Sequence, residues 1–245
     1  MTVSHETFAG LAERYALPPG AVEQLAALLT ALAADPHAPT TVRSPEEAVR
    51  VHVADSLVAL ELPEVHVARE LADVGAGAGF PGLPLAIALP QARVALVESN
   101  ARKCAFIRGA AEAAGVRNAI AVADRAESWT EGVGRCDVVT ARALAPLAVI
   151  AEYAAPLLRD GGLLVAWKGR RDADEERDAA AAAEQLGLAV EEVRPVIPYD
   201  GAEHRHLHLL RKVAPTPTRF PRRPGMARKR PLGAGSRPPS DREER

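Results

Sequence analysis

Large aromatic side chains are scarce in this chain of 245 residues, where Phe, Tyr and Trp together make up only 4%. Hydrophobic residues still account for 48% of the chain, so a buried core has to be built mainly from Ala, Leu and Val. Small aliphatic side chains of this kind suit helices that cover a β-sheet. One main domain is the default for a chain of this size, since single α/β domains reach about 200 to 250 residues.

Cysteines and long apolar runs are nearly missing as well. Cys104 and Cys136 are too few for a disulfide framework and lack the paired spacing of a zinc site. No apolar run approaches the roughly 18 residues that span a membrane. The N-terminal segment carries Glu6, Glu13 and Glu23 and has no signal-peptide pattern. We therefore expect a cytoplasmic protein that requires neither a membrane nor a metal ion.

Positive charge is concentrated near the C-terminus. The formal net charge is −2, but residues 211–245 hold eleven Lys and Arg against three Asp and Glu, which gives +8 there and leaves −10 for the rest. Clustered Lys and Arg gain free energy by releasing counterions from phosphates, so this arm predicts a polyanionic partner. A solvated tail without such a partner is the alternative. Pro, Arg and Gly dominate after Val213, which predicts a basic, largely disordered tail over residues 214–245.

The order of the expected elements indicates an α/β fold. Residues 5–34 have apolar positions at helical spacing, interrupted by a Pro-Pro-Gly turn, and another helix is expected from Ser44, followed by Pro45. These segments predict a helical cap over residues 1–65. From residue 69 onward, short β-branched runs alternate with Ala-rich amphipathic stretches, as in βαβ units. Residues 66–213 are therefore predicted to form the main domain.

Seven strands are predicted in that domain, with helices at about 81–89, 100–114, 144–158 and 173–186 between them. The strands are Glu70–Val74, Arg93–Glu98, Ala119–Ala123, Asp137–Thr140, Leu163–Trp167, Ala189–Val196 and Arg205–Leu210. The last two are joined by a link too short for a crossover helix, so they have to pair antiparallel. The predicted fold is a doubly wound, mostly parallel seven-stranded sheet with N-terminal helices and a C-terminal antiparallel hairpin.

A glycine-rich turn, DVGAGAGFPG, follows the first expected strand. Glycines permit positive φ and a close approach of a ligand to the backbone. When a dinucleotide GxGxxG motif is read from Gly75, Phe80 stands where the third glycine belongs. Read from Gly77, the motif fits but starts two residues further from the strand. A nicotinamide-dependent oxidoreductase that uses this second register is therefore one alternative.

Two carboxylates near this turn bear on the choice of ligand. Asp73 adds negative charge beside the loop and so favours a cationic ligand, such as S-adenosylmethionine with its ammonium and sulfonium groups, over a pyrophosphate. The other interpretation is that Asp73 only hydrogen-bonds the loop backbone. Glu98 ends the second strand 23 residues after Gly75, where a carboxylate accepts ribose hydroxyls in either nucleotide class.

Polar residues also follow the next three strands, at the sheet edge where ligands bind in such folds. Asp124–Glu127 lies where an adenine would be recognised, and Arg142 and Lys168 end the following strands. Glu127 and Arg142 could instead form exposed ion pairs, and Lys168 could be a solvated strand-end charge.

The histidines are less informative. His52 lies near Asp55 at helical spacing and could face the cleft or belong to the core, so no role is assigned to it. His204, His206 and His208 alternate along one strand and are interpreted as a hairpin surface rather than a metal cluster.

Several longer motifs occur in a fixed order: DVGAGAGFPGLPLAIALP, VALVESNARKCAFI, RAESW, VVTARALAPL, WKG and HRHLHLLRK, preceded by RVHVADSL with His52, Asp55 and Ser56. Together they resemble the bacterial ribosomal RNA small subunit methyltransferase G family, also called glucose-inhibited division protein B. The resemblance covers nearly the whole chain from about residue 40. The segment FPRRPGMARKRPL resembles the C-terminal extension of many Gram-positive members.

This resemblance implies transfer of a methyl group from S-adenosylmethionine to N7 of a guanine in 16S ribosomal RNA, within the small ribosomal subunit. Its motifs imply cofactor contacts at Gly75, Phe80, Ala126, Glu127 and Arg142. Combined with the reasoning above, the expected cofactor-binding set is Asp73, Gly75, Gly77, Phe80, Glu98, Ala126, Glu127 and Arg142. The expected catalytic set is Arg142, Lys168 and Glu127.

Guanine N7 carries a lone pair in its neutral form, so we expect no essential general base and a mechanism based on positioning. Arg142 and Lys168 are the candidates to hold the base, and Glu127 is the candidate to stabilise the positive charge that moves into the purine. We expect a monomer whose tail, from Arg219 to Arg230, binds RNA phosphates. Deleting residues 214–245 is then expected to weaken RNA binding and to leave cofactor binding intact.

Two further alternatives share parts of these features. A methyltransferase for a small molecule or a protein would have the same cofactor site without needing a basic arm. An RNA-binding protein with an inactive cofactor pocket would keep the arm and lose the chemistry.

Overall fold

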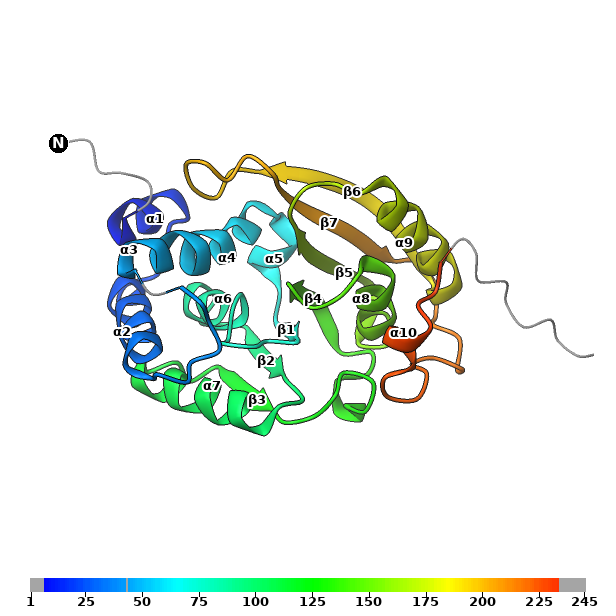
Figure 1. Cartoon of the computed structure of the whole chain (residues 1–245), viewed down its shortest axis with the longest axis horizontal. Helices are drawn as coiled ribbons and strands as arrows, with labels where there is room; N and C mark the ends of the chain where they lie inside the picture. The colour runs from blue at the N-terminus through cyan, green and yellow to red at the C-terminus, as the bar shows by residue number, and fades with distance from the viewer. Residues whose placement is uncertain (1–6, 43, 234–245) are drawn as a thin grey trace, which may run out of the picture.

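The computed structural model describes residues 7–42 and 44–233 and contains one seven-stranded sheet (Figure 1). The strand order is β3-β2-β1-β4-β5-β7-β6. The strands are β1 Glu70–Val74, β2 Arg93–Val97, β3 Ala119–Val122, β4 Cys136–Arg142, β5 Leu158–Lys168, β6 Leu188–Val196 and β7 Arg205–Lys212. All seven lie where the sequence predicts them, with ends that differ by a few residues.

The helices precede the sheet or connect its strands. They are α1 Phe8–Arg14, α2 Ala21–Ala34, α3 Pro45–Ala48, α4 Asp55–Leu57, α5 Pro63–Val67, α6 Gly82–Ala88, α7 Ala101–Ala113, α8 Leu147–Ala154, α9 Ala173–Leu186 and α10 Met226–Lys229. A π-helical stretch, Val49–Ala54, joins α3 to α4. The helix start predicted at Ser44 is confirmed, because the Ser44 hydroxyl accepts a hydrogen bond from the Glu47 N–H and Pro45 follows as the first helical residue.

The pairing of the strands confirms the predicted fold class. Strands β1 to β5 are parallel, with β1 between β2 and β4, and β7 pairs antiparallel with both β5 and β6. The chain leaves β1 toward β2 and β3 on one side and returns to β4 on the other. In open α/β sheets a reversal of this kind opens a crevice at the carboxyl ends of the strands, where ligands bind.

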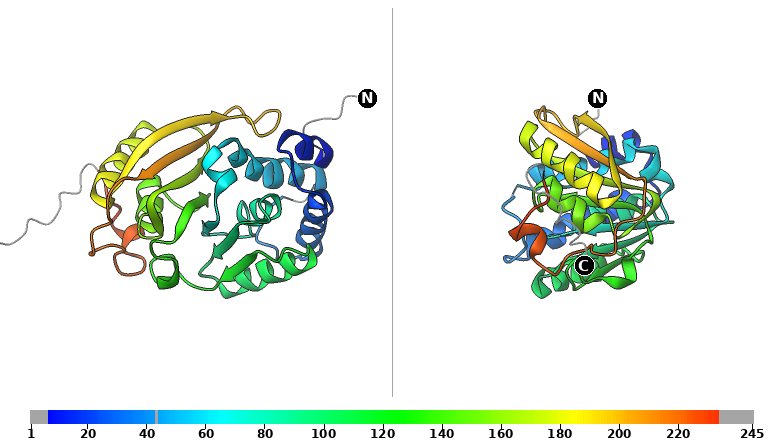
Figure 2. Two further views of the ribbon diagram at one scale, coloured as in Figure 1. Left: turned by 180° about the vertical axis from the view of Figure 1, so that it is seen from behind. Right: turned by 90° about the vertical axis from the view of Figure 1, so that its right-hand side faces the viewer.

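Helices cover both faces of the sheet (Figure 2), and each face has its own core. Neighbouring strand residues alternate between the two cores, as the period of two in a β-strand requires. In β4, for example, Val138 belongs to one core and Val139 to the other. The first core also contains Leu11, Leu25 and Leu57 from the N-terminal helices, all fully buried, so these helices pack in the same core as the sheet.

Residues 214–233 differ from the sequence-based expectation. Phe220, Ala227 and Leu232 are buried in the second core, and α10 packs against α8. The guanidinium of Arg222 binds the carboxylate of Glu152, whose side chain is only 1% exposed. The prediction of a largely disordered tail is therefore wrong for residues 214–233, because three apolar side chains and one buried ion pair dock this polar segment. Residues 234–245, to which the prediction also applied, lie outside the described residues.

Candidate active site

The glycine-rich turn between β1 and α6 needs its glycines for two physical reasons. Gly75 and Gly77 have φ values of +72° and +58°, in the left-handed region that side chains with a Cβ rarely adopt. At Gly75 a Cβ would also lie 2.4 Å from Cδ1 of Leu144, which covers the turn from the end of β4. At Gly77 the nearest such atom is 3.8 Å away. A side chain at Gly75 would therefore have to displace Leu144 in addition to adopting an unfavourable φ.

Asp73 holds this turn in shape from inside the protein. Its carboxylate is fully buried, Oδ2 accepts a hydrogen bond from the Gly82 N–H at 2.9 Å, and Oδ1 accepts one from the Thr140 hydroxyl at 3.1 Å. Burial raises the pKa of Asp73 to about 6. The expectation that Asp73 faces a cationic ligand is corrected here, since the structure matches the interpretation in which it hydrogen-bonds the loop.

A polar pocket of about 430 Å³ lies at the carboxyl ends of β1 to β4 and is called the first pocket below. Four residues of the expected cofactor set line it: Gly75, Glu98, Ala126 and Glu127. Asp124 and Arg125, from the segment expected at the adenine, line it as well. The sequence did not point to the other lining residues: Val74, Val97, Ser99, Asn100, Lys103, Ala143, Leu144, Tyr153 and Arg228.

Glu98 is fixed in the wall of the first pocket. Its Oε1 accepts a hydrogen bond from the Asn100 N–H at 2.8 Å, and its Oε2 accepts one from the Gly77 N–H at 3.1 Å. A carboxylate offers about four acceptor positions, so two remain for ribose hydroxyls. Gly77 itself does not line the pocket, and its contribution to the wall is this bond to Glu98.

A second pocket, of about 500 Å³, adjoins the first, and Ala143 lines both. Arg142 and Lys168 line the second pocket and not the first. The other residues around it are Thr41, Val42, Val51, His52, Asp55, Ala145, Trp167, Gly169 and Arg205. Ala143 has a φ of +52°, uncommon for a residue with a Cβ, at the point where the two pockets meet.

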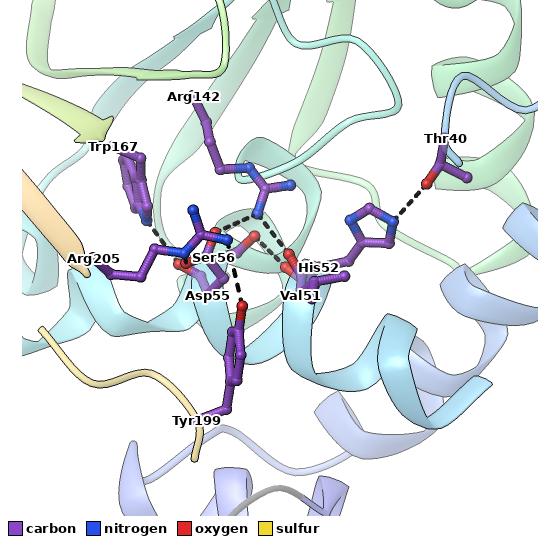
Figure 3. A network of polar contacts seen from close by, with 9 residues as sticks. All are labelled: Thr40, Val51, His52, Asp55, Ser56, Arg142, Trp167, Tyr199 and Arg205. Carbon is purple, nitrogen blue, oxygen red and sulfur yellow. Dashed lines mark hydrogen bonds and ion pairs between the residues drawn. The ribbon is translucent and has the colours of Figure 1, made fainter. Parts of the chain in front are cut away.

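Arg142 is anchored to the N-terminal helices rather than to the first pocket (Figure 3). Its Nη1 donates to Oδ2 of Asp55 at 2.8 Å and to the carbonyl of Val51 at 2.9 Å. The indole of Trp167 donates to the Asp55 carbonyl at 2.7 Å. Arg142 therefore lines the second pocket and not the first, and its expected roles toward the base and the cofactor stay predictions.

The side chain of Asp55 is 4% exposed and has one oxygen without a hydrogen-bond partner. That oxygen, Oδ1, lies 3.6 Å from Nε of Arg205, which is close enough for an ion pair and too long for a hydrogen bond. Sequence reasoning noted Asp55 only as a neighbour of His52. A lone acidic residue among the apolar positions of VHVADSL is the signal that could have identified it.

His52 lines the second pocket as a neutral imidazole. Its Nε2 hydrogen-bonds the Thr40 hydroxyl at 2.9 Å, and its ring stacks on Phe80 with the centroids 4.6 Å apart. Burial, together with the charge of Arg142, lowers the pKa of His52 to about 4. Phe80 is 5% exposed behind His52 and lines neither pocket, so its expected contact with the cofactor stays a prediction.

Lys168 reaches the second pocket from the end of β5 and forms an ion pair. Its Nζ lies 2.6 Å from Oε1 of Glu175, in the first turn of α9. The same carboxylate oxygen accepts a hydrogen bond from the Leu147 N–H at 2.8 Å. The Lys168 side chain is 21% exposed, which leaves its ammonium group accessible from the pocket.

The C-terminal segment reaches the first pocket. Oε1 of Glu127 accepts a hydrogen bond from the Gly225 N–H at 2.9 Å, and Arg228 lines the pocket while donating to the Leu144 carbonyl at 2.9 Å. The expectation that deleting residues 214–245 leaves cofactor binding intact therefore does not fit residues 214–233, which form part of the wall of the first pocket.

Two remaining expectations concern metals and the C-terminal histidines. Within the described residues, no three His, Cys, Asp or Glu are placed to hold a metal ion. His208 is 4% exposed, so the interpretation of the histidines as a hairpin surface is wrong for this residue. The reason is that its side chain faces the start of α9, where Glu175 and Glu176 interact electrostatically with it. None of the described helices is long and apolar enough to cross a membrane.

The fold and the crevice define the class of protein first. A parallel sheet that ends in the order β5-β7-β6, with a glycine-rich turn after β1 and an acidic residue after β2, is the architecture of the class I S-adenosylmethionine-dependent methyltransferases. A similar solved structure is an S-adenosylmethionine-dependent methyltransferase from Aquifex aeolicus, with a TM-score of 0.54 and 14% identity, covering 69% of this chain and 94% of that one. StiE O-MT residues 961–1257 gives a TM-score of 0.53 at 10% identity, covering 65% and 73%.

Sequence similarity then gives the family. The model of rRNA small subunit methyltransferase G matches residues 21–207. The ribosomal RNA small subunit methyltransferase G of Rubrobacter xylanophilus is 42% identical over 199 residues, which cover 79% of this chain and 76% of that protein. The protein of that name from Roseiflexus sp. is 44% identical over 201 residues, covering 79% and 83%. This chain belongs to the rRNA small subunit methyltransferase G family.

Proposed function

We propose that the protein transfers a methyl group from S-adenosylmethionine to N7 of a guanine in 16S ribosomal RNA, as a monomer in the cytoplasm. The observation that carries the proposal is the pair of adjoining pockets, which share Ala143. A methyl donor in one pocket and a base in the other would have their reacting atoms side by side. Holding two reactants in such an arrangement lowers the barrier by roughly 7 to 11 kcal/mol.

The residues of the first pocket fit the cofactor. Glu98 offers acceptor positions for ribose hydroxyls, and Gly75 presents backbone to the pocket at a positive φ. Glu127, which contacts the C-terminal segment, adds negative charge suited to the ammonium and sulfonium groups, while Asp124 follows β3 on the side expected for the nucleoside. S-adenosylmethionine supplies an electrophilic methyl group when bound.

The second pocket fits a guanine. The Watson–Crick edge of guanine presents N–H donors at N1 and N2 beside the O6 acceptor. Oδ1 of Asp55 is an acceptor that makes no hydrogen bond, 3.6 Å from the guanidinium of Arg205, and Arg142 and Lys168 carry donors suited to O6. Reading this edge leaves N7 free, whereas a bidentate arginine contact to O6 and N7 would block the reacting atom.

The chemistry needs positioning more than proton transfer. The lone pair of N7 lies in the plane of a neutral guanine, so its attack on the methyl carbon requires no base. His52 is neutral above a pH of about 4 and can contact the base without adding a positive charge. Positive charge moves into the purine during transfer, and the carboxylates of Asp55 and Glu127 are the pocket groups that would stabilise it.

The test is methyl transfer from labelled S-adenosylmethionine to small ribosomal subunits that lack this modification, followed by chemical cleavage at N7-methylguanine. Label at one cleavable guanine is the expected result. Label elsewhere would retain a methyltransferase and refute the proposed nucleotide. No transfer despite tight cofactor binding would refute the ribosomal substrate.

A thermal-shift comparison tests the oxidoreductase alternative. A ligand present at one hundred times its Kd stabilises the folded protein by roughly 2.7 kcal/mol. S-adenosylhomocysteine is therefore expected to raise the Tm, while NAD leaves it unchanged. The reverse pattern would refute the assignment of the first pocket.

A further inference from the structure

The C-terminal segment 214–233 forms part of the first pocket, although it lies beyond residues 21–207, which the family model matches. Two contacts tie it to the pocket wall. The Gly225 N–H donates to Glu127, and the buried ion pair of Arg222 with Glu152 fixes the segment on α8. The segment is thus built into the wall, and its side chains have defined positions relative to a ligand.

Arg228 is the side chain of this segment that lines the first pocket. Its guanidinium donates to the Leu144 carbonyl at 2.9 Å and hydrogen-bonds the side chain of Tyr153. Both partners belong to the β4 end of the pocket, where Leu144 covers Gly75. An arginine guanidinium carries five N–H donors in one plane, and these two bonds use only some of them. Arg228 therefore keeps donors for a ligand.

The pocket has two other lining cations, and both follow strands that lie on the other side of β1 from β4. Lys103 is in the first turn of α7, after β2, and Arg125 follows β3. Glu98, the expected ribose acceptor, is also at the end of β2. The nucleoside part of the cofactor therefore belongs on the side of β2 and β3, and its amino-acid part toward β4.

The second pocket supports the same orientation. The methyl group has to face the second pocket, which meets the first at Ala143, directly after β4. The same sulfur carries both the nucleoside and the chain that ends in the ammonium and α-carboxylate groups. With the nucleoside directed to Glu98 on the side of β2, the amino-acid chain is left to extend toward the β4 end, where Arg228 supplies the positive charge.

We propose that Arg228 binds the α-carboxylate of the cofactor, and that residues 214–233 close this end of the pocket. The inference rests on the proposed function and deepens its cofactor site. Arginine suits the task because its planar fork matches a carboxylate with two parallel hydrogen bonds. A basic segment that we expected to bind only RNA would then act on the cofactor itself.

The test compares two ligands that differ in the carboxylate alone: S-adenosylmethionine and decarboxylated S-adenosylmethionine. Their affinities are measured by isothermal titration calorimetry with the full-length protein and with Arg228→Gln. We expect the substitution to weaken S-adenosylmethionine binding about tenfold or more, because a charge-assisted hydrogen bond is lost. The affinity for the decarboxylated ligand should stay within about twofold.

Lys229→Gln is the matched control, since Lys229 is exposed on the same short helix and does not line the pocket. It should leave both affinities unchanged. An equal loss for both ligands in Arg228→Gln would show a structural role and overturn the inference, as would unchanged affinity for S-adenosylmethionine. Failure of the unmodified protein to bind S-adenosylmethionine would instead refute the proposed function.

Discussion

The guanidinium of Arg142 donates a hydrogen bond to the carboxylate of Asp55 at 2.8 Å, across 87 positions of sequence (Figure 3). The bond joins the end of β4 to the start of α4 and so fixes one wall of the second pocket to the N-terminal helices. Both side chains are shielded from water, with 14% and 4% of their surface exposed. Removing one partner of such a pair leaves a poorly solvated charge behind.

Asp55→Asn is therefore expected to lower the free energy of unfolding by about 3 kcal/mol, because Arg142 loses its counter-charge. Urea-induced unfolding at neutral pH measures this. Glu70→Gln is the matched control, since the Arg93–Glu70 pair is 84% and 46% exposed, and it should cost less than about 1 kcal/mol. Equal costs for the two variants would contradict the view that the Asp55 pair is structurally important.

The pH dependence of His52 is a second prediction. Its pKa of about 4 lies below the ordinary value of 6.5, so between these pH values the unfolded chain binds a proton that the folded protein excludes. The contribution of His52 to stability is thus complete above pH 6.5 and decreases as the pH falls toward 4. An NMR titration of the imidazole should give a midpoint near 4, and Arg142→Gln should raise it. A midpoint near 6.5 would mean that the ring is solvated.

Substitutions at Gly75 and Gly77 separate the effect of a steric clash from the effect of an unfavourable backbone conformation. Both have positive φ, but only at Gly75 would a Cβ clash with Leu144. Gly75→Ala is expected to weaken S-adenosylhomocysteine binding more than Gly77→Ala does, measured by calorimetry. Adding Leu144→Ala to Gly75→Ala should recover part of the loss. If both single variants lose affinity equally, backbone strain alone is responsible.

Substituting Lys168 tests whether the second pocket binds the base while the first binds the cofactor. It lines only the second pocket, so Lys168→Gln should reduce kcat/KM for small subunits about tenfold or more, through loss of a charge-assisted bond to the base. The affinity for S-adenosylhomocysteine should not change. Arg170→Gln removes the same charge from an exposed neighbour and should have a smaller effect. A comparable loss in both variants would point to general RNA attraction rather than to base recognition.

Much of the candidate site could be predicted because it depends on local sequence. Glu98, Ala126 and Glu127 follow strands whose hydrophobic pattern is clear, and parallel strands bring their carboxyl ends to one edge. Gly75 could be predicted from the conformational freedom that a tight turn requires. The position of Asp73 was recognised, but its burial was not, since burial depends on what packs against the turn.

The order of the elements, the parallel sheet with its final hairpin and the glycine-rich turn could all be predicted, because each follows from periodicity or from residue chemistry within a short window. The pairing of Arg142 with Asp55 and the entry of Arg228 into the first pocket depend instead on how distant parts of the chain pack together. These contacts join residues tens of positions apart, and no local pattern specifies which distant side chains will meet. Composition misjudged residues 214–233 for the same reason, because a few buried contacts can order a segment whose average character is polar and basic.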